Sequence, residues 1–376
     1  MRVVMFTHTL RSDWNHGNAH FLRGVAAELR ARGHEVHAFE PEDAWSVVNL
    51  VSEYGTAPLA GFAQAYPELV PAIHVYRPGH LDLDGALAGA DLVLVHEWND
   101  PALVAAIGER RDRHPFVLLF HDTHHRSVTA PDEIAAYDLA GYDGVLAFGD
   151  VIRDAYVAHR WAARAWTWHE AADTRHCAPD PAAPLEGDLV WIGNWGDGER
   201  SAELHEFLIG PAARLRLRAR VYGVRYPADA LRTLADAGIE YGGWLPNYEA
   251  PAVFSRFRVT VHVPRQPYLE KLPGIPTIRP FEALACGIPL VAARWRETGG
   301  LFTPGADFAV VDSGEEMTET LERLVGDDAA RARLAAHGRA TVLGAHTCAH
   351  RVDQLLAIAA EARARRVVAV GPGAIA

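Results

Sequence analysis

The chain has 376 residues, of which 49% are hydrophobic and 22% are charged, and its formal net charge is −12. These values are close to those of average soluble proteins and exclude a disordered or fibrous chain, while the length allows two or three domains. The acidic balance argues against sequence-independent nucleic-acid binding, which needs a basic face. It still permits a small anionic ligand on a local group of arginines.

The cysteines and the first residues indicate the cellular setting. The three cysteines are far apart and odd in number, so they predict neither a disulfide framework nor a zinc knuckle. The chain opens on MRVVMFTHTL, which is typical of a strand and not of a signal peptide. No apolar run approaches the ~20 residues that cross a bilayer. We therefore expect a cytoplasmic protein, with at most peripheral membrane contact.

The first half of the chain alternates short apolar runs with longer amphipathic stretches, as a parallel sheet covered by helices requires. A helix is expected at 19–32, ending at Gly33. The pattern predicts one doubly wound domain over residues 1–175. Its strands are expected at 3–7, 36–39, 91–96, 115–121 and 144–148.

A Pro- and Ala-rich stretch, residues 176–187, is typical of a linker, and the α/β pattern then begins again. This predicts a second Rossmann-like domain over 188–345, and a helix and tail over 346–376 that cross back to the first domain. The expected fold class is therefore α/β, with two Rossmann-like domains facing a central cleft. The strands of the second domain are expected at 189–192, 217–221, 260–263 and 290–293. Helices are expected at 202–208, 228–237 and 280–285, and two more begin at about residues 315 and 350.

The segment 274–290, GIPTIRPFEALACGIPL, is the most informative part of the sequence. A Pro-rich loop leads into a helix whose first turn contains Arg279 and Glu282 and which ends at Gly287. Free N–H groups at a helix N-terminus suit a phosphate. A carboxylate in the first turn can accept hydrogen bonds from two vicinal hydroxyls, as on a ribose. The alternative is that Glu282 only complements the helix dipole.

The block FEALACGIPLVAA resembles the signature of retaining GT-B glycosyltransferases, E-x7-E, in which the second Glu belongs to EAxAxGxPVV. Glu282 matches this second Glu, and the resemblance implies that it binds the ribose of a nucleotide. Gly274 stands where the first Glu is expected. PTIRPFEALACG is instead similar to the spore-maturation-protein-like (CgeB-like) branch, in which an Arg-x-x-Glu core replaces the two glutamates.

The segment DLVWIGNWGDGERSAEL resembles the GR-x5-K segment of the same family, whose two cations hold the donor diphosphate. Gly193 is present, Asn194 replaces the first cation, and Arg200 keeps the second. Arginine suits a diphosphate because it donates bidentate hydrogen bonds. The alternative for each cation is a solvated surface charge. Candidates for the missing positive charge are Arg265, Lys271 and Arg279.

Two segments of the first half also carry the resemblance. The loop 11–20 is similar to the glycine-bearing first loop of GT-B enzymes, with Gly17 and Asn18 at the matching positions; a plain tight turn is the alternative. His121 and Asp122 match an xxHD pattern at a strand end, which implies that the His lies beside the donor sugar and its phosphate as a catalytic group.

Other polar residues of the first half have weaker assignments. His121, His124 and His125 stand close together, but an HExxH zinc motif is missing, so a metal site is disfavoured. The segment WTWHEAADTRHCAP resembles the family's hinge, with His169 and Glu170 as candidate cleft residues. His96 and Glu97, at another strand end, are candidates for acceptor binding, with a structural role as the alternative.

The resulting hypothesis is a glycosyltransferase of the hexosyltransferase type (EC 2.4) in bacterial polysaccharide biosynthesis. It transfers a sugar from a nucleoside-diphosphate sugar to an acceptor hydroxyl with retention, and needs no metal or other cofactor. The donor base and sugar stay open, as does the acceptor, which is a glycan, a lipid-linked glycan or a small molecule. No nucleic-acid partner is expected.

Three alternatives were weighed against this hypothesis. A sugar-nucleotide epimerase or phosphorylase shares the fold, but an epimerase needs two carboxylates beside His121, and the sequence shows no clear pair. A catalytically inactive binding protein would explain the missing Glu and cation, yet would not be expected to keep Arg200, Glu282 and His121 together. An NAD-dependent dehydrogenase is disfavoured because the glycine fingerprint is missing.

Overall fold

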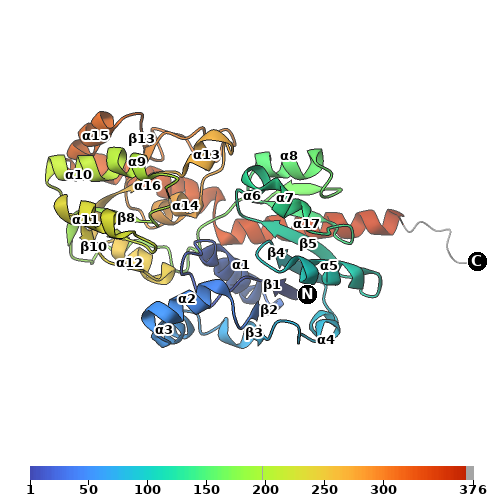
Figure 1. Ribbon diagram of the computed structural model, residues 1–376. Coiled ribbons are helices and arrows are strands. Elements are labelled where there is room, and N and C mark those ends of the chain that lie inside the picture. Colours follow the sequence, from blue (N-terminus) through green and yellow to red (C-terminus); the bar gives the residue numbers. More distant parts are fainter. Residues whose placement is uncertain (197, 370–376) are drawn as a thin grey trace, which may run out of the picture. The chain divides into compact units, whose positions relative to one another are not determined.

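The computed structural model describes residues 1–196 and 198–369. The chain forms two compact units (Figure 1). The first comprises Met1–Ser12, Leu22–His169 and the chain from Cys348 onwards, and the second comprises Asp13–Phe21 and Glu170–Thr347. The loop Asp13–Phe21 thus groups with the second unit, although its sequence neighbours on both sides belong to the first. The domain boundaries expected from the sequence, at 175, 187 and 345, remain a prediction. The last seven residues of the expected tail, 370–376, lie outside the described residues.

The first unit contains a seven-stranded sheet in the order β3-β2-β1-β4-β5-β6-β7, and all paired strands are parallel. The order reverses between β1 and β4, which is the position where open α/β sheets leave room for ligands. The strands are β1 (Arg2–Phe6), β2 (Glu35–Pro41), β3 (Ile73–Tyr76), β4 (Leu92–His96), β5 (Val117–Asp122), β6 (Gly144–Ala147) and β7 (Ala165–Thr167).

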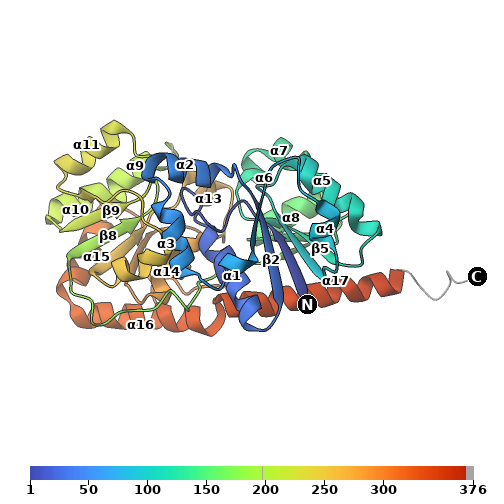
Figure 2. The ribbon, with the colours of Figure 1, turned by 90° about the horizontal axis from the view of Figure 1, so that it is seen from below.

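The helices between these strands are mostly short. The last helix of the chain, α17 (Cys348–Ala369), packs beside the first unit's sheet and crosses the direction of its strands (Figure 2). The Trp168 indole donates to the Arg351 carbonyl at 2.9 Å, which fixes this helix to the end of the sheet. The others are α1 (Ala19–Ala31), α2 (Trp45–Tyr54), α3 (Ala57–Ala65), η1 (Val70–Ala72), α4 (Leu83–Leu87), α5 (Pro101–Glu109), η2 (Arg110–Asp112), α6 (Arg126–Thr129), α7 (Pro131–Ala135) and α8 (Asp150–Ala158).

The second unit contains a six-stranded parallel sheet in the order β10-β9-β8-β11-β12-β13. Its strands are β8 (Gly187–Ile192), β9 (Ala219–Tyr222), β10 (Glu240–Tyr241), β11 (Phe257–His262), β12 (Leu290–Ala293) and β13 (Ala309–Val311). Its helices are α9 (Ser201–Leu204), η3 (His205–Ile209), α10 (Gly210–Leu215), α11 (Ala228–Asp236), η4 (Asn247–Glu249), α12 (Ala250–Phe254), α13 (Gln266–Glu270), α14 (Ile278–Ala285), α15 (Gly314–Gly326) and α16 (Asp328–Ala345).

The predicted α/β class is confirmed, because both sheets are parallel and helices alternate with their strands along the chain. Every residue of β4 and β5 is buried, as expected for strands covered on both faces. β4 ends in His96, β5 ends in His121 and Asp122, and β11 of the second unit ends in His262. Polar side chains therefore gather where the carboxyl ends of parallel strands place ligands.

Several element boundaries differ from the predicted ones for local reasons. The strand expected at 217–221 begins at Ala219, because Arg216 ends α10 in the left-handed conformation with φ 52°. The helix expected at 280–285 begins at Ile278, after the N-cap residue Thr277. The helix expected at 202–208 continues through a π-helical turn into α10, and ends at Leu215.

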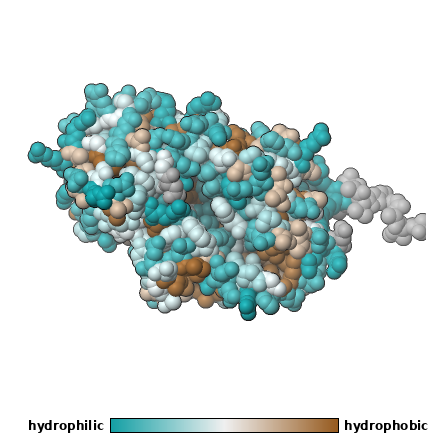
Figure 3. Space-filling view, viewed as in Figure 1, coloured by the Kyte–Doolittle hydropathy of each residue, from teal (hydrophilic) through white to brown (hydrophobic). Residues whose placement is uncertain are grey.

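The face of the molecule shown in Figure 3 is mostly hydrophilic, with hydrophobic residues gathered in a few small patches. This agrees with the near-average hydrophobic content and the net charge of −12. Among the helices of residues 1–196 and 198–369, none combines the length and the hydrophobicity that crossing a bilayer requires.

Candidate functional site

A half-buried cation, Arg200, lies at the carboxyl end of the second unit's sheet. Its Nη1 donates to the Val263 carbonyl at 3.0 Å, its Nη2 donates to the Asn194 carbonyl, and the guanidinium lies 5.0 Å from the centre of the Trp191 ring. The loops after β8 and β11 therefore hold this side chain from both sides. Within the described parts of the chain, Arg200 forms no ion pair with a carboxylate.

The surroundings of Arg200 have an excess of positive charge. Burial, with repulsion from Arg265 and Arg279, lowers the pKa of Arg200 to about 9. Burial, with repulsion from Arg200 and Arg279, lowers the pKa of His262 to about 3. Arg200 Nε and His262 Nδ1 are buried without a hydrogen-bond partner among the described residues. An anion would relieve both the repulsion and the unmet hydrogen bonds.

The other three cations predicted for the site differ in their ion-pair partners. Arg265, after β11, pairs with Glu199 at 3.2 Å, and Arg279 pairs with Glu282. Lys271, at the end of α13, is exposed, and its ammonium group contacts no acceptor in the described chain. The structure thus brings Arg265 and Arg279 each close enough to repel Arg200, with Lys271 on the surface.

Glu282 is buried in the first two turns of α14, with 1% of the residue exposed. One carboxylate oxygen pairs with Arg279, and the other lies 3.5 Å from His20 Nδ1. Burial raises the pKa of Glu282 to about 7, against the opposing effect of Arg279. The Thr277 side chain does not cap the helix, so the first N–H groups of α14 keep their capacity to bind an anion.

Gly193 and Asn194 form the loop that follows β8. The Gly193 N–H donates to the Tyr222 carbonyl at 2.8 Å, and the Gly193 carbonyl accepts from the Tyr226 hydroxyl at 2.8 Å. A Cβ atom on Gly193 would lie 2.7 Å from the Trp191 ring, so only glycine fits here. The Asn194 side chain accepts from the Val224 N–H at 2.9 Å and donates to Asn15.

Gly274 explains the departure from the E-x7-E pattern. Its φ is +81°, and a Cβ atom there would lie 2.1 Å from Thr298 Oγ1. Its N–H donates to the Arg296 carbonyl, which holds the two loops together. A glutamate at this position would be strained and would collide with the neighbouring loop. The missing first Glu is therefore a consequence of how the loop after β12 packs.

We predict that Gly274→Ala lowers the free energy of unfolding by about 2–4 kcal/mol, since it combines a strained backbone with a clash. Gly238→Ala is the matched control, because its φ is +71° but a Cβ there would meet nothing within 4 Å. Urea denaturation of both variants separates the two effects. Equal losses in the two variants would show that the contact with Thr298 has no cost.

The loop Asp13–Phe21 is hydrogen-bonded to the same site. The Asp13 carboxylate accepts from Trp244 Nε1 and from the Asn247 N–H, each at 3.0 Å. The Gly17 carbonyl accepts from Asn247 Nδ2 at 3.3 Å, and Asn18 Nδ2 donates to Glu170 at 2.7 Å. Gly17 and Asn18, predicted as site residues from the first half of the chain, thus lie in the second unit with Glu282.

His121 and Asp122 end β5 in the first unit and are buried. Burial lowers the pKa of His121 to about 3, so the ring is neutral at ordinary pH and can act through hydrogen bonds but not through charge. The Asp122 carboxylate accepts from the Tyr156 hydroxyl at 2.9 Å and from the His124 N–H at 3.0 Å. These contacts orient the loop after β5.

The structure also reveals a pair of carboxylates beside His121, which sequence reasoning missed. Burial raises the pKa values of Glu97 and Asp122, and Glu97 raises that of Asp122 further. Glu97 accepts from Arg126 at 2.8 Å and from the Thr123 N–H at 2.8 Å. Because both acids are fully buried and hold neighbouring groups in place, they do not form the open acid–base pair that an epimerase needs.

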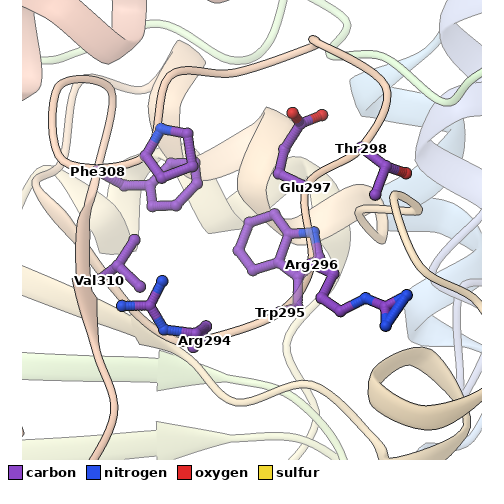
Figure 4. Close-up of a pocket in the computed structure, with 8 residues that line it drawn as sticks. Arg294, Trp295, Arg296, Glu297, Thr298, Phe308 and Val310 are labelled. Carbon is purple, nitrogen blue, oxygen red and sulfur yellow. The ribbon is translucent and has the colours of Figure 1, made fainter.

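A cavity of about 320 Å³ follows β12 (Figure 4). Trp295 forms part of its wall, stacks on Phe308 with ring centres 5.0 Å apart, and meets the edge of His262 at 5.2 Å. The cavity therefore borders the group of cations without containing it. Its lining residues are Arg294, Trp295, Arg296, Glu297, Thr298, Pro304, Phe308 and Val310.

Among the described residues, groups of three or more His, Cys, Asp or Glu side chains arranged to hold a metal ion are not found. The Asp-x-Asp sequence at 82–84 belongs to α4 in the first unit. Asp82 caps that helix by accepting from the Gly85 N–H, and Asp84 pairs with Arg110. These two aspartates therefore have structural roles.

Comparison with known proteins places this geometry in context. Residues 200–357 match a protein family described as glycosyl transferase-like. The solved structure of sucrose-phosphate synthase from Thermosynechococcus elongatus is similar over 99% of this chain and 100% of that one, with a TM-score of 0.67 and 15% sequence identity. The fold is that of the GT-B glycosyltransferases.

Two further glycosyltransferase-fold structures are similar in the same way. An α-glucosyltransferase in complex with UDP and a 13-mer DNA has a TM-score of 0.65 and 14% identity, over 96% of this chain and 99% of that one. Anabaena HepE in complex with UDP and glucose has a TM-score of 0.62 and 12% identity, over 96% of this chain and 100% of that one. Among curated proteins, none matches the chain significantly in sequence. The family match includes Arg200, Arg265, Arg279 and Glu282.

Proposed function

We propose that the chain is a glycosyltransferase that moves a sugar from a nucleoside-diphosphate sugar to an acceptor hydroxyl. The observation that carries this proposal is Arg200, a half-buried cation without a carboxylate partner in the described chain, beside Arg279 and His262 at the carboxyl end of a parallel sheet. A diphosphate supplies the negative charge that this arrangement lacks.

The donor would occupy the second unit. Arg200, with Arg265, Arg279 and the exposed Lys271, would hold the diphosphate, together with the N-terminus of α14 and the Gly193–Asn194 loop. Glu282 would accept hydrogen bonds from the ribose hydroxyls. Because Glu282 is 1% exposed and residues 13–18 are bonded beside it, donor binding requires this part of the loop, which precedes α1, to shift.

These residues would position the donor and stabilise the negative charge of the leaving diphosphate. As the bond between the sugar and the diphosphate breaks, negative charge grows on the leaving phosphate, and fixed cations lower the energy of that state. We propose retention from the resemblance to retaining enzymes, with the leaving phosphate assisting the acceptor hydroxyl. From the same resemblance we propose His121 as a catalytic group that acts through a hydrogen bond of its neutral ring, and Asp122 would orient its loop.

Two observations guide the choice of substrates to test. Structures of similar fold contain UDP, so UDP-glucose is the first donor to test. One of those proteins also binds DNA, but the net charge of −12 argues against nucleic acid as the acceptor here. A glycan, a lipid-linked glycan or a small hydroxylated molecule is the acceptor class proposed.

We predict that the chain releases nucleoside diphosphate from a nucleotide sugar at an unchanged rate in EDTA, because arginines provide the charge that a divalent cation otherwise supplies. Release of UDP or GDP from UDP- and GDP-sugars, with a panel of sugar acceptors, is the measurement. The anomeric proton coupling of the product reports retention or inversion. Loss of activity in EDTA with recovery in Mg²⁺ or Mn²⁺ would contradict metal independence.

A further inference from the structure

We propose that His20 is a positioning residue for Glu282, and that the pair makes the donor site selective for ribonucleotides over 2′-deoxyribonucleotides. This inference rests on the proposed function, since it concerns how the same site recognises the sugar of its nucleotide.

The hydrogen bonds of His20 determine which of its ring nitrogens carries the proton. The Asp173 backbone N–H donates to His20 Nε2 at 2.9 Å. A backbone N–H can only donate, so Nε2 must present a lone pair, and the ring is neutral with its proton on Nδ1. Nδ1 faces Glu282 Oε1 at 3.5 Å, and the two side chains are each 1% exposed. The His20 ring thus directs an N–H group at the carboxylate.

The orientation of the Glu282 carboxylate depends on two opposing neighbours. Arg279 engages Oε2, while Oε1 accepts no hydrogen bond in the described chain and faces His20 Nδ1 at 3.5 Å. Without His20, only Arg279 would fix the carboxylate, which could then turn about its terminal bond. With both neighbours the plane is set, and the remaining lone pairs of the two oxygens have fixed directions.

A carboxylate in a fixed plane is suited to a vicinal diol, because its two oxygens can accept from two neighbouring hydroxyls at once. Removing the 2′-hydroxyl of a bound nucleotide would leave one of these buried acceptors unpaired, which is a costly state. A carboxylate free to turn would instead adjust to the single 3′-hydroxyl. Selectivity for the ribose should therefore depend on His20 and not only on Glu282.

The test compares UDP with 2′-deoxy-UDP by calorimetric titration at pH 8, with the GDP and ADP pairs in parallel. Wild type is expected to prefer the ribonucleotide about 10- to 100-fold. His20→Ala and His20→Gln should reduce the preference below about threefold. His20→Asn should retain it, because the Asn amide nitrogen occupies the place of Nδ1. A role in folding alone would not separate Asn from Gln.

Three results would decide against the inference. An unchanged preference in His20→Ala, or in His20→Gln if the Ala variant does not fold, would overturn it. Equal loss in the Asn and Gln variants would overturn the tautomer argument on which it stands. If wild type binds none of the six nucleotides, the proposed function itself fails. If wild type binds both members of a pair equally, only this inference fails.

Discussion

Replacing Arg200 by Met is expected to weaken the binding of a nucleoside diphosphate by about 100-fold or more. The guanidinium is half-buried, with Nε fully buried, and is already bonded to the Val263 and Asn194 carbonyls, so its charge is fixed in place before any ligand arrives. Truncating one partner of a buried charged pair costs about 2–5 kcal/mol, and every 1.4 kcal/mol is tenfold in affinity. Calorimetric titration of the nucleotide that wild type binds measures the effect.

The matched control is Arg218→Met, because the Arg218 side chain is 63% exposed and lies 3.6 Å from its partner Asp188. Its dissociation constant should equal that of wild type. Since Arg200 also bonds two backbone carbonyls, the melting temperature of each variant must be recorded to show that the site is folded. A folded Arg200→Met variant that binds within threefold of wild type would remove Arg200 from the site.

Glu170→Gln is expected to remove about 3–4 kcal/mol from the pH dependence of stability between pH 5 and pH 8. Burial, with a contribution from Glu282, raises the pKa of Glu170 to about 8, while Asn18 and Arg279 oppose the shift. In the unfolded chain the same group loses its proton near pH 4.5, so between the two values the folded state holds the extra proton. Stability therefore falls as pH rises, by about 3–4 kcal/mol between pH 5 and pH 8.

The side-chain amide of the Glu170→Gln variant does not titrate, so this variant should gain about 3–4 kcal/mol over wild type as the pH goes from 5 to 8. Urea denaturation at several pH values gives this difference directly. Glu322→Gln serves as the control, since Glu322 is exposed on α15, and its curve should run parallel to that of wild type. A Glu170→Gln curve that is also parallel would show that Glu170 is ionised throughout.

Strands could be located from the sequence wherever they are continuous apolar runs. Runs such as LVLVH and VLLFH are buried on both faces, and their ends were predicted to within two residues. β3 and β7 were missed because they are three or four residues long, lie at the edges of the sheet and are only partly buried. α16 was missed because small and charged residues are mixed along its whole length.

The candidate site was only partly predictable. Glu282, Arg279 and Arg200 were predicted from the resemblance to family motifs, which is visible because each motif is a continuous stretch of sequence. His262 gave a signal, a histidine at the end of an apolar strand, which was not used. No signal in the sequence points to His20 or Asp13, because their hydrogen-bond partners lie over 150 residues away in the chain. The reason for Gly274 likewise depends on Thr298, in another loop.

The central claim is that the second unit binds a nucleoside diphosphate without metal. The most direct measurement is titration of the intact chain with UDP, GDP, ADP and dTDP in EDTA. The proposed site predicts that at least one nucleotide binds with one molecule per chain, and that a saturating concentration of ~100 times its Kd stabilises the fold by ~2.7 kcal/mol. If none of the four binds, or binding appears only with a divalent cation, the claim is contradicted.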